Sequence, residues 1–198
     1  MKQRPYTMKA RADATQRTHQ RILQAGVALF WEKLSLDITL DDIAARAGVT
    51  VQTILRHFGA REQLFDAMEV FAHQTVIEER QAPVGDIPAA VTVIFDHYER
   101  LGDAVLRLLG QEFWDARIRS ITENGRRLHR EWVERVFAPR LAVYPSADRE
   151  AVTDLLVVAT DVYTWKLLRR DRALERPPAE DRVKRLIAAI LVDDHRGA

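Results

Sequence analysis

The side chains whose chemistry suits nucleic-acid recognition gather between residues 50 and 61 of this chain. An amide can pair with N6 and N7 of adenine, a guanidinium group can bind guanine or a phosphate, and valine or leucine can contact the methyl group of thymine. Such side chains read DNA when a helix carries them into the major groove. The residues that we expect at base edges are Val51, Gln52, Thr53, Leu55 and Arg56. For each of them the alternative is a solvated surface side chain.

A second group of side chains suits the phosphate backbone, whose contacts position a protein without reading the base sequence. It comprises Thr39, Arg46, Thr50, His57 and Arg61. His57 can equally be a packing or capping residue at the end of a helix, and the sequence leaves both roles open. Additional backbone contacts are expected from Lys9, Arg11, Arg17 and Arg21.

Residues 39–58 predict the element that positions these side chains, two short helices joined by a tight glycine turn. Thr39 can cap the first helix, and Asp42, three residues later, can complete a capping box. Gly48 can adopt the positive φ that ends a helix, and Thr50 can cap the second helix. The inward faces are expected at Ile43, Ala44, Ala47, Ile54 and Phe58. Two capped helices around a glycine are typical of a helix-turn-helix.

Helical periodicity continues through the rest of the chain, without an alternating strand pattern. We expect helices at 14–33, 62–79, 87–101, 103–114, 122–143, 146–170 and 180–192. Gly102 is interpreted as an interruption, and Asp103 and Ser146 as caps. The predicted fold is all-α, with about nine helices in a three-helix head and a larger helical body.

Three parts with different charge are predicted along the chain. They are a flexible basic tail at 1–14, which contains Pro5 and no apolar period, a DNA-binding domain at 15–60, and an effector-binding and dimerisation domain at 61–198. Residues 1–61 carry ten Lys and Arg against five acidic residues, a net charge of +5, whereas the remainder carries 20 bases against 24 acids. A basic head on an acidic body indicates a polyanionic partner at the N-terminal end only.

Composition argues against several other classes of protein. The chain has no cysteine, which excludes disulfides, a thiolate nucleophile and Cys-ligated zinc, and fits a reducing cytosol. No run approaches the roughly 18 apolar residues of a membrane span, and the N-terminus lacks the apolar core of a secretory signal. No GxSxG, HExxH or phosphate-binding glycine loop occurs, and the six histidines form no i, i+4 pair. We therefore expect a cytoplasmic protein without membrane partner, catalytic residue, metal or cofactor.

The N-terminal region resembles the TetR/AcrR family of transcriptional regulators. The pattern that carries the resemblance is Ile22-Leu23-Gln24-Ala25, Leu29-Phe30, Thr39, Asp42-Ile43-Ala44, Ala47-Gly48-Val49-Thr50, Thr53-Ile54, His57-Phe58, Glu62 and Leu64. The resemblance implies a homodimer with three-helix DNA-binding heads and a helical sensor body that dimerises through its last two helices. The sequence departs from the family pattern with Leu34 for a common glycine, Ser35 for an aromatic residue, Leu55 for a DNA-contacting tyrosine and Arg61 for lysine.

The body contains two further sets of candidates. Aromatic stripes are usually core, but a body of long helices can also enclose an apolar pocket with a few polar anchors. The effector-pocket candidates are Phe71, Phe95, Tyr98, Trp114, His129, Trp132 and Tyr163. Wide apolar faces on the last two predicted helices favour a partner subunit, with an intramolecular core as the alternative. The dimer-interface candidates are Leu155, Val158, Val162, Trp165, Leu186 and Ile190.

Together with the resemblance, these patterns predict a repressor that responds to a ligand. It would bind a pseudo-palindromic double-stranded operator as a homodimer and be released by an unidentified small molecule. The alternative is a helical ligand-binding or interaction protein with weakened sequence-specific DNA binding, because Leu55 replaces the tyrosine. A metal-dependent helical hydrolase is a third class, for which the spacing of the histidines supplies no ligand set.

Overall fold

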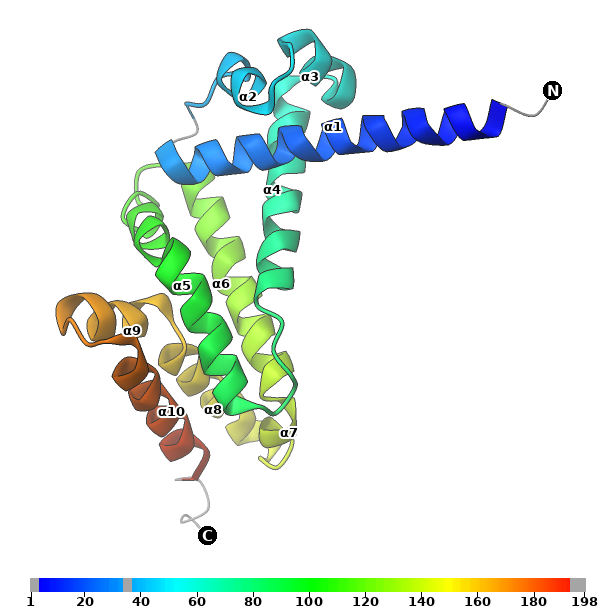
Figure 1. Cartoon of the computed structure of the whole chain (residues 1–198). Coiled ribbons are helices and arrows are strands. Elements are labelled where there is room, and N and C mark those ends of the chain that lie inside the picture. Colours follow the sequence, from blue (N-terminus) through cyan, green and yellow to red (C-terminus); the bar gives the residue numbers. More distant parts are fainter. Residues whose placement is uncertain (1–3, 34–36, 193–198) are drawn as a thin grey trace. The chain divides into compact units, whose positions relative to one another are not determined.

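The computed structural model describes residues 4–33 and 37–192, which are helical apart from short connections. Within these ranges no strand occurs, so the predicted all-α class is confirmed (Figure 1). The chain divides into two compact units, an N-terminal unit of residues 1–76 and a C-terminal unit of residues 77–198. Leu34 and Ser35, two of the departures from the family pattern, lie outside the described residues.

The N-terminal unit is built on the helices α1 (Arg4–Lys33), α2 (Leu40–Ala47), α3 (Val51–Phe58) and the first part of α4 (Arg61–Glu79). Its core is formed by fully buried aliphatic side chains from all of these helices and one connection: Ile22, Ile38, Ile43, Ile54 and Leu64. The predicted close approach at Gly26 is present, because a Cβ added there would lie 2.5 Å from the sulfur of Met68. Helices α2 and α3 and the first part of α4 are thereby fixed against α1.

Helix α1 begins earlier than expected. Its 30 residues include positions 4–14, where the sequence predicts a flexible tail. Pro5 is compatible with this start because the first turn of a helix has no intrahelical use for the missing N–H. Residues 9–17 are exposed on all sides of the helix, so no apolar period marks them. The prediction treated this missing period as disorder, although good helix formers can continue a helix whose later turns are packed.

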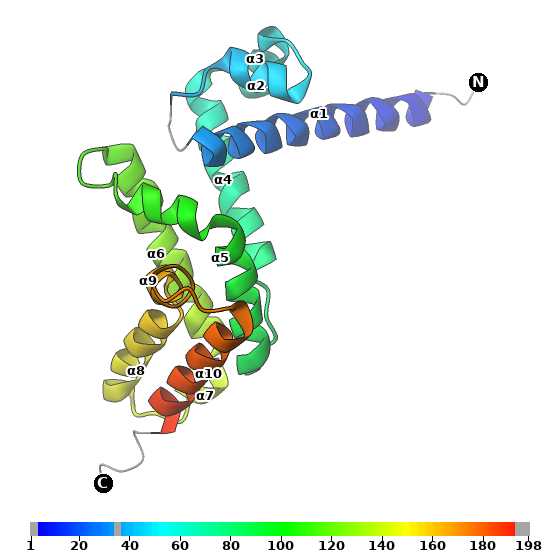
Figure 2. The same cartoon turned by 60° about the vertical axis from the view of Figure 1, so that its left-hand side comes forward.

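The C-terminal unit contains the end of α4 and the remaining helices. These are α5 (Ile87–Leu109), α6 (Ala116–Val136), α7 (Ala138–Leu141), α8 (Ser146–Ala159), α9 (Val162–Lys166), the π-helical turn η1 (Leu167–Asp171) and α10 (Arg176–Val192). Helix α10 packs on α5 and α8, and α6 packs on α5 and α8 (Figure 2). One continuous apolar core joins them, and Phe95, Phe137, Leu156, Trp165 and Ile187 are almost fully buried in it.

The predicted interruption at Gly102 is wrong, because α5 runs through it. A Cβ at this position would lie 2.5 Å from Cζ3 of Trp165, so the glycine permits a close approach inside a continuous helix. Asp103 does not cap a helix but accepts from the guanidinium group of Arg170 at 2.9 Å. The next helix is capped instead by Asp115, whose carboxylate accepts from the backbone N–H of Arg117.

The single helix predicted at 146–170 is also wrong. The chain breaks at Thr160 and restarts at α9, where Asp161 accepts from the backbone N–H of Tyr163 at 2.8 Å. Ser146 is the first residue of α8 rather than its cap, and the cap position falls on Pro145 without a side-chain hydrogen bond. The last helix starts at Arg176, so the two following prolines lie in its first turn rather than in a loop.

Candidate nucleic-acid interface

The start of α2 is a complete capping box, as predicted. Thr39 Oγ1 accepts from the backbone N–H of Asp42 at 3.1 Å, and Asp42 Oδ2 accepts from the backbone N–H of Thr39 at 3.0 Å. The hydrogen bond from the Thr39 backbone, followed by that from Lys33, lowers the pKa of Asp42 to about 2. Gly48 ends α2 with φ 63° and ψ 43°, the left-handed conformation expected of it. The turn between α2 and α3 is therefore fixed from both ends.

Helix α3 is equally well defined at its ends. Thr50 Oγ1 accepts from the backbone N–H of Thr53 at 3.1 Å, and Gly59 stops the helix with φ 86°. Ile54 is fully buried, whereas Phe58 is half-buried and stacks on the ring of His19 with centroids 4.4 Å apart. The side of α3 that carries Ile54 and Phe58 is consequently packed against the N-terminal unit, and its opposite side faces solvent.

The exposed face of α3 carries three of the five base-edge candidates. Gln52, Leu55 and Arg56 are exposed, and their spacing of three and four residues places them on one side of the helix. Val51 and Thr53 are half-buried at the edge of this side. We call Gln52, Leu55 and Arg56 the reading face.

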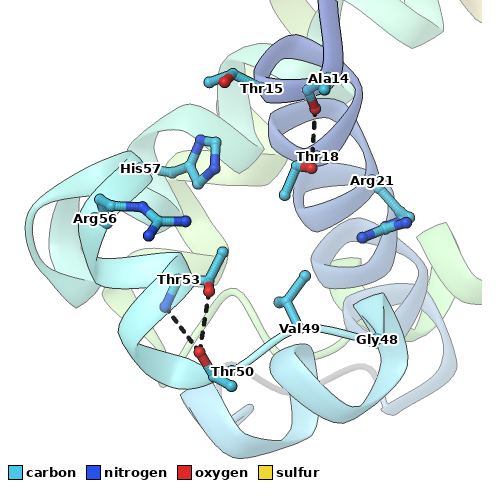
Figure 3. A pocket seen from close by; sticks show the side chains of 10 residues that line it. All are labelled: Ala14, Thr15, Thr18, Arg21, Gly48, Val49, Thr50, Thr53, Arg56 and His57. Atoms are coloured by element: carbon cyan, nitrogen blue, oxygen red, sulfur yellow. Dashed lines mark hydrogen bonds between the residues drawn. The ribbon is translucent and has the colours of Figure 1, made fainter. Parts of the chain in front are cut away.

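A groove of about 530 Å³ lies between α1 and α3 beside the reading face (Figure 3). Its walls are Ala14, Thr15, Thr18, Arg21, Gly48, Val49, Thr50, Thr53, Arg56 and His57, among which there is no carboxylate. Figure 3 shows Arg56 and Arg21 on opposite walls of this groove. Within the described residues, neither guanidinium group has an acidic side chain within 4 Å. The groove is therefore lined by cations and hydroxyl groups that suit an anionic partner.

The sequence interpretation included Arg21 of α1 but missed Thr15 and Thr18. Thr15 and Thr18 lie one turn apart on the same wall as Arg21. Their hydroxyl groups donate to backbone carbonyls one turn earlier, at 2.9 and 3.0 Å. The recurrence of polar residues at positions 15, 18 and 21 was the available signal, because these positions share one face of the helix predicted at 14–33.

Two of the phosphate candidates are engaged inside the N-terminal unit. Arg46 donates to both carboxylate oxygens of Glu32, at 2.8 and 2.6 Å. Arg61 donates to the carbonyl of Ile38 at 3.3 Å, and its guanidinium lies 4.4 Å from the centroid of the Phe65 ring. Arg61 therefore connects the start of α4 to the segment before α2, which is a structural role. The Arg46 pair is exposed, so a phosphate can compete with its carboxylate.

His57 is half-buried at the end of α3. Its ring centroid lies 5.9 Å from that of His19. Burial, followed by the nearby His19 and Arg56, lowers the pKa of His57. The imidazole is thus neutral near pH 7, so it can offer a phosphate an N–H group but no charge. This geometry favours the packing role over a charged contact.

Comparison with known proteins agrees with this arrangement. The profile described as "Bacterial regulatory proteins, tetR family" matches residues 22–68, which span the core of the N-terminal unit. The N-terminal unit therefore contains a DNA-binding domain of the TetR family. The chain is accordingly a DNA-binding transcriptional regulator, and the family and fold are those of proteins that are generally not enzymes.

A solved structure supports the fold of the whole chain. It is that of a candidate transcriptional regulator from Streptomyces coelicolor A3(2), with a TM-score of 0.56 and 22% sequence identity. The similarity covers 89% of this chain and 99% of that one. At this level of identity it establishes the shared fold only. No curated protein matches the chain significantly. Among the described helices, none is long and apolar enough to cross a membrane.

The effector-pocket candidates fall into three groups. Phe71 is half-buried in the N-terminal unit. Trp114 and Tyr163 are 79% and 53% exposed, so they do not line an interior pocket. The remaining four are buried in the C-terminal unit: Phe95, Tyr98, His129 and Trp132. The spacing of the aromatic residues in the sequence did not separate the buried ones from the exposed ones. Trp114, for example, lies in the turn after α5 rather than in a helix.

The dimer-interface candidates also divide. Leu155, Val158 and Leu186 are exposed on α8 and α10. Val162 and Trp165 are 4% and 1% exposed, so they belong to the core of the C-terminal unit and present no surface to a partner. Ile190 is partly buried against the same core. The prediction placed all of them on continuous helix faces, and the break at Thr160 reorients the residues that follow it.

Proposed function

We propose that the chain is a repressor that binds a pseudo-palindromic operator as a homodimer and leaves it when a small molecule binds the C-terminal unit. The observation that carries the DNA-binding part is the reading face, which is exposed and borders a groove without carboxylates. Helix α3, which Thr50 caps and Gly59 ends, can enter the major groove without losing its own hydrogen bonds.

The three side chains of the reading face have separate roles in this proposal. Gln52 pairs with N6 and N7 of adenine, and Arg56 binds N7 and O6 of guanine or an adjacent phosphate. Leu55, which is 39% exposed, contacts a thymine methyl group. Val51 and Thr53 support them at the edge of the helix.

Phosphate contacts position the reading face. The oxygen of Thr39 accepts from the helix backbone, which leaves its hydroxyl proton available for a phosphate oxygen. Thr50 Oγ1 also accepts from the backbone and shares a hydrogen bond with Thr53 Oγ1, so this pair of hydroxyl groups has one further proton for a phosphate. Arg21 adds a contact on α1, whereas the hydroxyl protons of Thr15 and Thr18 go to backbone carbonyls. Because cations dominate these contacts, binding weakens steeply as salt rises.

Dimerisation is supported by exposed apolar side chains on two helices that pack on each other. Leu155 and Val158 lie three residues apart on α8 and are 52% and 62% exposed, and Leu186 on the neighbouring α10 is 42% exposed. Large aliphatic side chains in water on adjacent helices suit a self-complementary contact with a second copy. A two-fold dimer then presents two reading faces, which matches a pseudo-palindrome.

The test is an in vitro selection of duplexes from a random library by the purified chain. The expected product is an inverted repeat with half-site centres separated by about one helical turn (10–10.5 base pairs) or somewhat more. A single asymmetric site contradicts the homodimer. Failure to enrich any sequence contradicts sequence-specific regulation and favours the alternative of a helical ligand-binding protein whose head lost selectivity with Leu55.

A further inference from the structure

A cluster of four buried polar side chains lies in the core of the C-terminal unit, and we call it the Arg80 cluster. Its members are Arg80, His97, Tyr98 and His129, of which none is more than 8% exposed. Arginine and histidine are seldom buried so deeply unless another group satisfies them. Arg80 directly follows α4, where no periodicity identifies it in the sequence.

Several contacts hold the cluster together. The backbone carbonyl of Arg80 accepts from Nε1 of Trp132 at 2.7 Å, and the Arg80 guanidinium carbon lies 5.5 Å from the centroid of the Tyr98 ring. Tyr98 donates its hydroxyl proton to the carbonyl of Thr160 at 3.2 Å. The ring of His129 stacks on Trp132 with centroids 5.7 Å apart. The cluster therefore joins the end of α4, both α5 and α6, and the break between α8 and α9.

Three nitrogen atoms of the Arg80 cluster are buried without a hydrogen-bond partner in the described part of the chain. They are Nε of Arg80 and Nδ1 of both His97 and His129. A buried polar atom that loses its hydrogen bond to water without replacement is destabilising, so such atoms are rare in folded proteins. Three such nitrogen atoms in one cluster indicate that a ligand, which this chain does not itself supply, forms hydrogen bonds with them.

The neighbouring carboxylates Glu79 and Asp161 favour the charge of Arg80 from a distance, but each makes its direct contacts with other groups. Glu79 forms an ion pair with Arg100, and its oxygen lies 3.7 Å from Nδ1 of His97, beyond hydrogen-bond distance. Asp161 accepts from the backbone N–H of Tyr163 as the cap of α9. Within the described residues, no acidic side chain forms an ion pair with Arg80.

The charge of the Arg80 cluster defines the ligand that fits it. Burial lowers the pKa of His97 to about 4 and that of His129 to about 3, so both are neutral near pH 7. Arg80 keeps its charge, because a guanidinium group is not deprotonated in proteins. His129 Nε2 lies 3.1 Å from Oγ1 of Thr160, whose proton goes to the carbonyl of Leu156 at 2.7 Å, which leaves Nδ1 as an acceptor.

We infer that the Arg80 cluster binds a small organic carboxylate. The carboxylate pairs with the guanidinium group of Arg80, and the apolar part of the ligand lies against the rings of Tyr98 and Trp132. One buried positive charge among aromatic rings fits an organic monoanion better than a hydrated phosphate dianion. A hydroxyl or N–H on the ligand can donate to Nδ1 of His129. The inference rests on the proposed function, since it names the chemical class of the effector.

The experiment measures binding of benzoate, 4-hydroxybenzoate and hexanoate to the full chain by calorimetry and thermal shift. Neutral benzamide and inorganic phosphate serve as comparison ligands. We expect at least one carboxylate to bind the wild type and to bind Arg80→Met about tenfold to a hundredfold more weakly, the loss expected for a charge-assisted pair. Arg127→Met, which removes an exposed guanidinium from α6, should bind like the wild type.

Two further readouts separate a binding role of Arg80 from a structural one. Because no carboxylate in the described part of the chain forms an ion pair with Arg80, removing this buried charge should leave the melting temperature of ligand-free Arg80→Met equal to or above that of the wild type. In the wild type, the bound carboxylate should shift the imidazole NMR signals of His97 and His129, while those of His19 and His57 in the N-terminal unit should not move. The NMR result requires no variant to fold.

The outcomes are decisive in each case. The inference is overturned if no carboxylate in the set binds, if Arg80→Met binds as tightly as the wild type, or if phosphate binds in their place. Operator binding is measured separately. Carboxylate binding that leaves the DNA complex intact upholds the inference and contradicts the effector part of the proposed function. Sequence-selective operator binding without carboxylate binding overturns the inference and upholds the DNA-binding part of the proposed function.

Discussion

At the scale of single residues, the reading face depends on one amide and one guanidinium group. Leu55 occupies the position where related proteins carry a tyrosine, so a hydroxyl donor is absent there and an aliphatic side chain is exposed instead. Gln52 and Arg56 then supply the polar contacts that distinguish base pairs on this helix. Base selectivity should consequently respond strongly to either residue alone.

Gln52→Ala is expected to relax the preference at one base pair in each half-site, which reduces discrimination there by about 1–3 kcal/mol. The measurement is a competition of single-substitution operator variants for the wild type and the mutant chain. Gln24→Ala, an equally exposed amide on α1 outside the groove, is the control. An unchanged base preference at every position would show that Gln52 does not recognise a base pair.

The buried histidines predict a pH dependence of stability. The pKa values of His97 and His129 fall from 6.5 to about 4 and about 3 on folding, so the unfolded chain binds more protons below pH 6.5. Their contribution is therefore complete above pH 6.5 and is lost as the pH falls, by about 1.4 kcal/mol per pH unit for each histidine. Urea unfolding at pH 7.5 and 5.5, in buffers without carboxylates, measures the loss.

The matched variant for this prediction is His97→Gln combined with His129→Gln. It should unfold with a smaller difference between the two pH values than the wild type, because the two titrating groups are gone. Equal differences for both chains would show that other groups determine the acid sensitivity of the C-terminal unit.

Residues that act over short sequence distances could be predicted from the sequence. The capping box of Thr39 and Asp42 and the turn at Gly48 involve neighbours three to six residues apart, and they lie where expected. The partners of Arg46 and Arg61 could not be predicted, because Glu32 and Ile38 are 14 and 23 residues away. The orphan nitrogens of the Arg80 cluster were equally inaccessible, since they depend on the packing of four helices.

At the scale of elements, the surroundings of a helical glycine determine its effect on the stability of the helix and its packing. A Cβ at Gly102 would meet the rigid indole ring of Trp165, whereas nothing lies within 4 Å of a Cβ at Gly125 on α6. At Gly26 the contact is with the flexible end of Met68, which can move aside. The same residue type inside three helices therefore has three different consequences for stability.

Gly102→Ala is expected to destabilise the chain by about 1–3 kcal/mol, because Trp165 or α5 must shift to admit the methyl group. Gly125→Ala is expected to stabilise it by about 0.5–1 kcal/mol through helix propensity alone. Chemical unfolding of both variants gives the two free energies. A stabilising Gly102→Ala would contradict the close packing of α5 on α9.

Helix existence was predictable from periodicity, but three boundaries were not. The break at Thr160 falls inside an apolar run that favours one long helix, and the competing capping role of Asp161 decides it. The start of α1 falls in a segment without apolar side chains in a stripe, which periodicity cannot assign. Gly102 was misassigned because the indole that explains it is distant in the sequence.

At the scale of the whole molecule, a homodimer would cover the exposed leucine and valine side chains of α8 and α10. The double variant Leu155→Glu and Val158→Glu should sediment as a monomer, because two carboxylates would be buried in the contact. Val143→Glu changes an equally exposed apolar residue between α7 and α8 and is expected to leave the dimer intact. A wild-type chain that sediments as a monomer would contradict the homodimer. A double variant that still sediments as a dimer would show that the subunits meet at another surface.

The account as a whole depends on sequence-selective binding of DNA by the reading face. The most direct measurement is a fluorescence anisotropy titration of a selected operator and of a scrambled duplex with the same composition, at about 50 and 200 mM salt. We predict that the operator binds about 10³-fold or more tightly than the scrambled duplex, and that both affinities fall steeply at the higher salt. Equal affinity for the two duplexes would contradict the account, because the head would then bind DNA only as a polyanion.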